Sequence, residues 1–122
     1  MEHSLRFSKL CDDARARVTE VSIDDVHAKQ TRGESFYLVD VREDREWDKG
    51  RITGAIHLGR GVIERDLEKT IPDPNAEIVL YCGGGFRSAL AAESVAKMGY
   101  TRVASMAGGW RAWTGKGLPT TK

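Results

Sequence analysis

The sequence is poor in the residues that stabilise small disulfide-rich or metal-binding proteins. Only two cysteines, Cys11 and Cys82, and three histidines occur among its 122 residues. One pair of cysteines cannot form a disulfide framework, and the chain has neither a CxxC pair nor a Cys/His cluster with zinc-ligand spacing. We therefore expect no metal site, and a chain of this length buries enough apolar surface to fold without one.

Long apolar runs and an excess of one charge are also missing. No stretch reaches the roughly eighteen apolar residues of a membrane span. Residues 1–20 carry charges throughout, unlike the apolar centre of a secretory signal. Nineteen Lys and Arg balance eighteen Asp and Glu, so nothing in the overall charge attracts nucleic acid or an anionic membrane. The expected location is the cytoplasm, with neither nucleic acid nor membrane as a partner.

The hydrophobic pattern divides the chain into an N-terminal extension, residues 1–17, and one domain, residues 18–119. The extension places Leu5, Phe7, Leu10 and Cys11 at loosely helical spacing, which suggests a helix that docks on the domain or contacts a partner. In the domain, the apolar runs at 36–41 and 78–81 are typical of strands buried on both faces of a parallel sheet. Helical segments alternate with strands, so we expect an α/β fold with helices on both faces.

The most informative segment leads from the run at 78–81 into a helix expected to begin near Ser88. Cys82 follows the strand, three glycines follow Cys82, and Arg87 precedes Ser88. Open α/β sheets place their ligands at the carboxyl ends of parallel strands. A glycine-rich turn can direct successive N–H groups inward, and the N-terminus of a helix adds unpaired donors. The segment therefore predicts an anion-binding loop.

An anion-binding loop around a cysteine favours the thiolate. We interpret Cys82 as a nucleophile that needs no histidine base, whereas the alternative is a buried cysteine that packs as a small hydrophobe. Asp40 and Arg42, at the end of the run at 36–41, either orient the loop or a substrate anion, or form an internal ion pair or a turn cap. The expected substrate-binding residues are those that follow the cysteine: Gly83, Gly84, Gly85, Phe86, Arg87 and Ser88.

The spacing within the loop bears on the reaction. Four residues separate Cys82 from Arg87, whereas tyrosine-phosphatase-type loops have five residues between Cys and Arg. The shorter loop forms a tighter cradle, which suits one sulfur atom on the cysteine better than a phosphoryl or arsenate group.

With these motifs the chain resembles the rhodanese family, the single-domain sulfurtransferases. The resemblance covers roughly residues 18–119. Two positions depart from the usual pattern: Arg51 stands where a histidine is common, and Gly83 stands where many active members carry a charged residue. The motifs that carry the resemblance are YLVDVRE at 37–43 with EW at 46–47, GRITGAIHL at 50–58, CGGGFRS at 82–88, GGW at 108–110 with Trp113, and GLP at 117–119.

The resemblance implies a five-stranded parallel sheet flanked by helices and a reaction that moves a sulfane sulfur. Thiosulfate or another persulfide donor would load Cys82 as a persulfide, and a thiophilic acceptor such as cyanide or a protein thiol would take the sulfur. No cofactor is implied. Two alternatives stay open: a non-catalytic rhodanese-like module that binds proteins, and, less favoured, a phosphatase or arsenate reductase.

Overall fold

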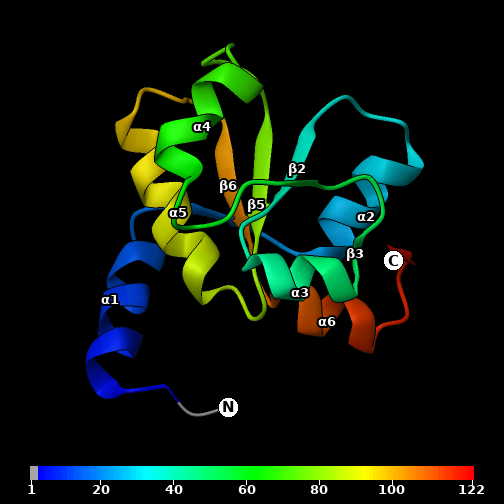
Figure 1. The fold of residues 1–122 in the computed structure, drawn as a ribbon, viewed down its shortest axis with the longest axis horizontal. Helices are drawn as coiled ribbons and strands as arrows, with labels where there is room; N and C mark the ends of the chain where they lie inside the picture. Colours follow the sequence, from blue (N-terminus) through cyan, green and yellow to red (C-terminus); the bar gives the residue numbers. More distant parts are fainter. Residues whose placement is uncertain (1–2) are drawn as a thin grey trace.

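A central parallel sheet organises the computed structural model, which describes residues 3–122 (Figure 1). Its strand order is β1-β6-β5-β2-β4, and every neighbouring pair is parallel. The expected five-stranded parallel sheet is therefore confirmed. The strands are β1 (Thr19–Val21), β2 (Tyr37–Asp40), β4 (Ile56–His57), β5 (Ile78–Tyr81) and β6 (Val103–Met106).

Helices flank both faces of the sheet, as expected (Figure 1). Those of residues 3–122 are α1 (Leu5–Arg15), α2 (Ile23–Thr31), α3 (Asp44–Lys49), α4 (Ile63–Thr70), α5 (Phe86–Lys97) and α6 (Gly109–Gly115). α4 and α5 pack on the face that carries Val39 and Leu80, whereas α2 and α6 pack on the face that carries Leu38 and Val79. None of the helices in this described part is long and apolar enough to cross a membrane.

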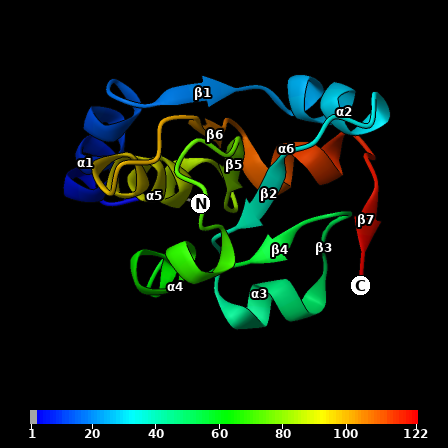
Figure 2. The ribbon, with the colours of Figure 1, turned by 90° about the horizontal axis from the view of Figure 1, so that it is seen from above.

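The N-terminal extension forms α1, which lies alongside α5 (Figure 2). Its docked face is only partly the one expected from the sequence. Cys11 is fully buried, but Leu5 and Leu10 are 89% and 53% exposed. Phe7, Cys11 and Ala14 stand at the i, i+4, i+7 spacing of one helical face, and that face turns toward the domain.

Two short strands were not predicted from the sequence. β3 (Arg51–Ile52) pairs antiparallel with β7 (Thr120–Thr121) outside the main sheet. Two-residue strands are too short for the alternation that identifies longer ones. This ladder ties the C-terminal segment to the chain between α3 and β4.

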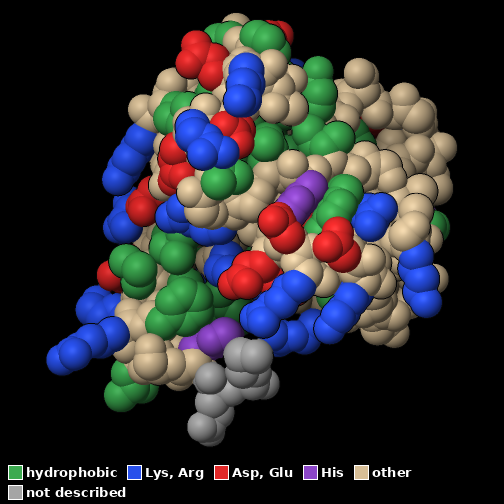
Figure 3. Space-filling view, viewed as in Figure 1, with side chains coloured by type: hydrophobic (Ala, Val, Ile, Leu, Met, Phe, Trp, Pro, Cys, Tyr) green, Lys and Arg blue, Asp and Glu red, His purple; other side chains and the backbone are tan. Residues whose placement is uncertain are grey.

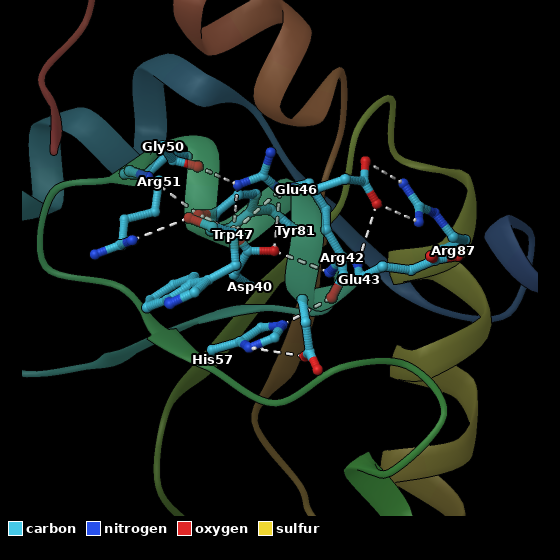
Figure 4. Close-up of polar contacts among 12 residues, drawn as sticks. Asp40, Arg42, Glu43, Glu46, Trp47, Gly50, Arg51, His57, Tyr81 and Arg87 are labelled. Carbon is cyan, nitrogen blue, oxygen red and sulfur yellow. Dashed lines mark hydrogen bonds and ion pairs between the residues drawn. The ribbon is translucent and has the colours of Figure 1, made fainter. Parts of the chain in front are cut away.

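A buried polar network joins the ends of β2 and β5 (Figure 4). Arg42 Nη2 lies 2.8 Å from Asp40 Oδ2, and both side chains are almost inaccessible to solvent. Burial, reinforced by the Asp40 carboxylate, raises the pKa of Tyr81, so the phenol stays protonated and donates to Asp40 Oδ2 at 2.6 Å. Its oxygen accepts the N–H of Ile52 at 3.1 Å, and Arg42 also donates to the carbonyl of Gly50. Of the interpretations offered for Asp40 and Arg42, the structural one is observed: the side chains form an internal ion pair, and Asp40 Oδ1 caps the turn by accepting the N–H of Arg42 at 2.9 Å.

Asp40→Ala should destabilise the protein strongly. The substitution leaves the Arg42 guanidinium buried with its charge unpaired, which costs about 3–5 kcal/mol. Urea unfolding followed by circular dichroism gives the free energy of unfolding. As a control, Asp13→Ala breaks an ion pair with Lys9 whose side chains are 49% and 77% exposed and should cost less than about 1 kcal/mol. Equal losses in the two variants would contradict the assignment.

Candidate active site

Cys82 lies at the carboxyl end of β5, the strand between β2 and β6. Its side chain is 1% exposed. Sγ accepts hydrogen bonds from the backbone N–H of Gly85 at 3.2 Å and from that of Ser88 at 3.3 Å. Backbone donors stabilise an anionic sulfur, so the loop holds the cysteine in surroundings suited to a thiolate.

The helix after the loop begins earlier than expected. α5 starts at Phe86, not near Ser88, because Gly85 adopts a left-handed conformation (φ 92°) and serves as the N-cap. A side chain is disfavoured in that conformation. The N–H groups of Phe86 and Arg87 thereby fall in the first helical turn, where they have no intrahelical acceptor. The last residues of the loop are thus also the positive end of a twelve-residue helix.

Two buried hydroxyls extend the hydrogen bonding around the sulfur. Ser88 Oγ lies 3.5 Å from Cys82 Sγ and 2.8 Å from Ser105 Oγ on β6, and both serines are inaccessible to solvent. When the sulfur is a thiolate, Ser105 can donate to Ser88 while Ser88 donates to the sulfur. When the sulfur is a thiol that donates to Ser88, Ser88 donates in turn to Ser105. The hydroxyl hydrogen of Ser105 then has no acceptor among these contacts. The hydroxyl pair can therefore act as a hydrogen-bond donor to an anionic sulfur at this position.

Ser88→Ala should slow alkylation of Cys82 by iodoacetamide about tenfold at pH 7. The change removes a hydroxyl that donates to the sulfur anion, an interaction worth about 1.5–3 kcal/mol. The rate is measured by mass spectrometry of the peptide that contains Cys82. Ser94→Ala, the same substitution further along α5, is the control and should leave the rate unchanged. An equal rate in the Ser88 variant would show that the hydroxyl does not act on the sulfur.

The loop is held from outside by α6. The N–H of Trp110 donates to the carbonyl of Cys82 at 2.8 Å, and the N–H of Arg111 donates to that of Gly83 at 3.0 Å. These contacts require Gly109, because a Cβ there would overlap the Cys82 carbonyl oxygen, and its φ of 56° also disfavours a side chain. The N-terminus of α6 therefore fixes the first two residues of the loop.

Gly109→Ala should reduce the free energy of unfolding by at least about 2 kcal/mol, because it combines a steric overlap with backbone strain. It should also slow iodoacetamide labelling of Cys82, because α6 must move away from the loop. Gly115→Ala is the control: a Cβ there meets nothing within 4 Å, and stability should stay within about 1 kcal/mol of the unmodified protein. Urea unfolding and peptide mass spectrometry give the two quantities. Equal stability in the two variants would contradict the tight contact.

Cys82 opens onto a pocket of about 350 Å³. Of the residues expected at the site, Gly83, Gly84, Phe86 and Arg87 line this pocket, whereas Gly85 and Ser88 act through their hydrogen bonds to Sγ. The remaining lining residues come from distant segments: His3, Phe7, Glu43, Arg45, Glu46, Trp110 and Arg111. Only one sequence motif indicates part of this second group: Gly-Gly-Trp, which places Trp110 and Arg111 at the start of α6.

Arg87 is not free to bind a ligand without first giving up a partner. Its guanidinium forms a two-pronged pair with Glu46 of α3, with N–O distances of 3.0 and 3.3 Å (Figure 4). Burial acts to raise the pKa of Glu46, but hydrogen bonds from Arg87 and from the N–H of Glu43 outweigh it, and the pKa is lowered overall. The pair therefore stays charged at neutral pH, and Arg87 contributes little net positive charge to the pocket.

Cys11 is placed under α1, within electrostatic reach of Cys82, and both cysteines are free. Burial raises the pKa of the Cys11 thiol; Arg15 acts in the opposite direction, and the charge of Cys82 adds to the rise. A fully buried, protonated thiol is a weak nucleophile. The structure therefore does not favour Cys11 as a relay for sulfur.

Arg51 packs against Trp47 of α3. Its guanidinium stacks on the Trp47 ring at 4.3 Å, and Nη2 donates to the Trp47 carbonyl at 3.0 Å (Figure 4). His57 stacks on the same ring, and its Nε2 lies 2.8 Å from the Arg42 carbonyl oxygen. Arg51 therefore helps pack the segment that follows α3 and does not line the Cys82 pocket.

Within residues 3–122, no cluster of three His, Cys, Asp or Glu side chains could hold a metal ion.

Together the fold and the site define an α/β protein with a cysteine that accepts two backbone N–H groups at the carboxyl end of a parallel sheet. A family model, the Rhodanese-like domain, matches residues 22–116. The chain belongs to this family.

Proteins with similar sequences are named for sulfur chemistry. A "Sulfurtransferase" from Allochromatium vinosum is 31% identical over 102 residues, 84% of this chain and 94% of that protein. The "Putative sulfur carrier protein YrkF" of Bacillus subtilis is 34% identical over 99 residues, 81% of this chain. The match spans only 52% of that relative's length.

One solved structure matches nearly the whole chain, with a TM-score of 0.85, 31% identity and 99% coverage of each chain. It is a protein of unknown function from Rhodopseudomonas palustris, RPA3614, described as a "Possible Tyrosine Phosphatase". Its coverage includes the region of α1, which the family match leaves out.

Proposed function

We propose that the chain is a sulfurtransferase that moves a sulfane sulfur through a persulfide on Cys82. One observation carries the proposal: the Sγ of Cys82 accepts two loop N–H groups and lies beside the Ser88 hydroxyl, at the closed end of a pocket. The names of its relatives support the same class of reaction. No cofactor is required, and the expected location remains the cytoplasm.

The first half-reaction loads the cysteine. The Cys82 thiolate attacks the outer sulfur of thiosulfate, a new S–S bond forms, and the original S–S bond breaks so that its electron pair leaves with sulfite. A persulfide donor would react in the same way and release a thiolate. In the second half-reaction, cyanide or a cysteine thiol attacks the outer sulfur of the Cys82 persulfide, and the cysteine departs as a thiolate. This order predicts ping-pong kinetics.

The loop has further N–H groups that can donate hydrogen bonds to the outer sulfur of a Cys82 persulfide. The N–H groups of Gly83 and Gly84 donate to no backbone carbonyl within residues 3–122. Phe86 and Arg87 lie in the first turn of α5, where N–H groups have no intrahelical acceptor. These four N–H groups can stabilise charge on a persulfide in both half-reactions.

Phosphatase activity is the second function to test, because the similar protein from Rhodopseudomonas palustris carries that suggestion. Two features argue against it in this chain. The loop has four residues between Cys82 and Arg87. Arg87 is also paired with Glu46, so it could bind the oxygens of a phosphoryl group only if its ion pair with Glu46 broke.

The central prediction is that thiosulfate adds one sulfur atom to the protein, and that Cys82→Ser abolishes the addition because the attacking thiolate is gone. Intact-mass spectrometry measures the gain, and cyanide should remove it. Cys11→Ala serves as the matched control and should load normally.

Other results of this experiment would separate the alternatives. Loading by a persulfide donor but not by thiosulfate would identify a sulfur carrier with a different donor. Loading by neither would refute the sulfurtransferase proposal and favour the protein-binding module. Hydrolysis of p-nitrophenyl phosphate that depends on Cys82 would instead establish a phosphatase.

A further inference from the structure

The Cys82 pocket contains a cation, Arg111, that no acidic side chain of residues 3–122 neutralises. Within residues 3–122, the Arg111 guanidinium has no acidic group within salt-bridge distance and forms no side-chain hydrogen bond. Its backbone position is fixed, because the Arg111 N–H donates to the carbonyl of Gly83 at the start of α6. The exposed side chain of Arg111 therefore starts from a backbone position beside the loop.

The guanidinium lies over the glycines that follow the cysteine. A Cβ built on Gly84 would lie 3.4 Å from Arg111 Nη1, and one built on Gly83 would lie 3.9 Å from Nη2. A larger side chain at either position would compete with Arg111 for this space. The absence of side chains at Gly83 and Gly84 thus lets a cation from α6 approach within a few ångströms of the backbone next to Cys82.

The other charges that line the pocket are paired. Arg87 binds Glu46 at 3.0 Å, and Arg45 lies 3.6 Å from Glu43. Figure 3 shows basic and acidic side chains side by side on the face over α3. With these two pairs balanced, the charge that remains among the lining residues within 3–122 is that of Arg111.

A second polar atom of the pocket lining has no partner within the described part of the chain. His3, ahead of α1, lines the pocket, and its ring lies 4.4 Å from the ring of Phe86. Its Nε2 is buried and has no hydrogen-bond partner within residues 3–122. A buried nitrogen of this kind is usually satisfied by a bound group or by water. Arg111 indicates a ligand that brings hydrogen-bond acceptors, and His3 Nε2 is a second polar atom available to it.

From these observations we propose that Arg111 is a specificity-determining residue: its guanidinium binds the anionic group that adjoins the reactive sulfur of the donor, such as the sulfonate of thiosulfate. The inference rests on the proposed sulfur transfer at Cys82. Planar N–H donors of arginine suit the oxygens of such a group. In the first half-reaction, the same contact would stabilise the charge that collects on the departing sulfite.

The binding of an anion at Arg111 can be tested without any sulfur transfer. Iodoacetate and iodoacetamide react with the same thiolate but differ in charge, so the ratio of their rate constants at Cys82 reports the field of nearby cations. We expect Arg111→Gln to lower the iodoacetate-to-iodoacetamide ratio about three- to tenfold. Arg111→Lys should restore part of it. Added salt should lower the ratio in the unmodified protein more than in Arg111→Gln.

The control is Arg102→Gln. Arg102 immediately precedes β6 at the opposite end of the sheet, and its side chain is 60% exposed and pairs with Glu77. This variant has the same net charge as Arg111→Gln but should keep the ratio of the unmodified protein. An unchanged ratio in Arg111→Gln, or an equal fall in Arg102→Gln, would overturn the proposal.

Steady-state kinetics then connect the site to the reaction. With cyanide saturating, Arg111→Gln should raise the KM for thiosulfate about tenfold and also weaken product inhibition by sulfite. Circular dichroism should show an unchanged fold. If the ratio of alkylation rates falls but thiosulfate never loads Cys82 in any variant, the sulfur-transfer proposal fails while the anion site stands. If thiosulfate loads Arg111→Gln with an unchanged KM, the assignment of Arg111 fails while sulfur transfer stands.

Discussion

The geometry of the site depends on two backbone hydrogen bonds between α6 and the loop that contains Cys82. The N–H groups of Trp110 and Arg111 reach the carbonyls of Cys82 and Gly83, and Gly109 allows the two segments to come this close. The same contacts turn the loop so that later N–H groups meet the sulfur. They also deliver the side chain of Arg111 to the pocket. Holding the cysteine and supplying a cation are thus two results of one interaction.

Much of the fold followed from local pattern. The apolar runs at 36–41 and 78–81 correctly predicted the buried strands β2 and β5, because strands covered on both faces by helices need apolar residues at successive positions. The strand, the three glycines and the helix after them were enough to place Cys82 at the carboxyl edge of the sheet. These features lie within one short stretch of sequence, so they could be found without knowing the rest of the fold.

The parts that could not be predicted depend on contacts between distant segments. Glu46 pairs with Arg87 across 41 residues, and Ser105 meets Ser88 across 17. A local sequence pattern does not show which side chains of one helix or strand will contact those of another. α1 shows the same limit, because the spacing predicted a helix while only packing against α5 shows that Leu5 points to solvent.

The dependence of the loop on its surroundings bears on attempts to transplant it. A designer who moved only residues 82–88 to another scaffold would leave two carbonyls without the donors of α6 and a serine without Ser105. The smallest graft that keeps these partners runs from β5 through α6, close to a third of the protein. The seven-residue motif alone is therefore unsuited to grafting. A functional graft would have to include the helices and strands that contact the loop.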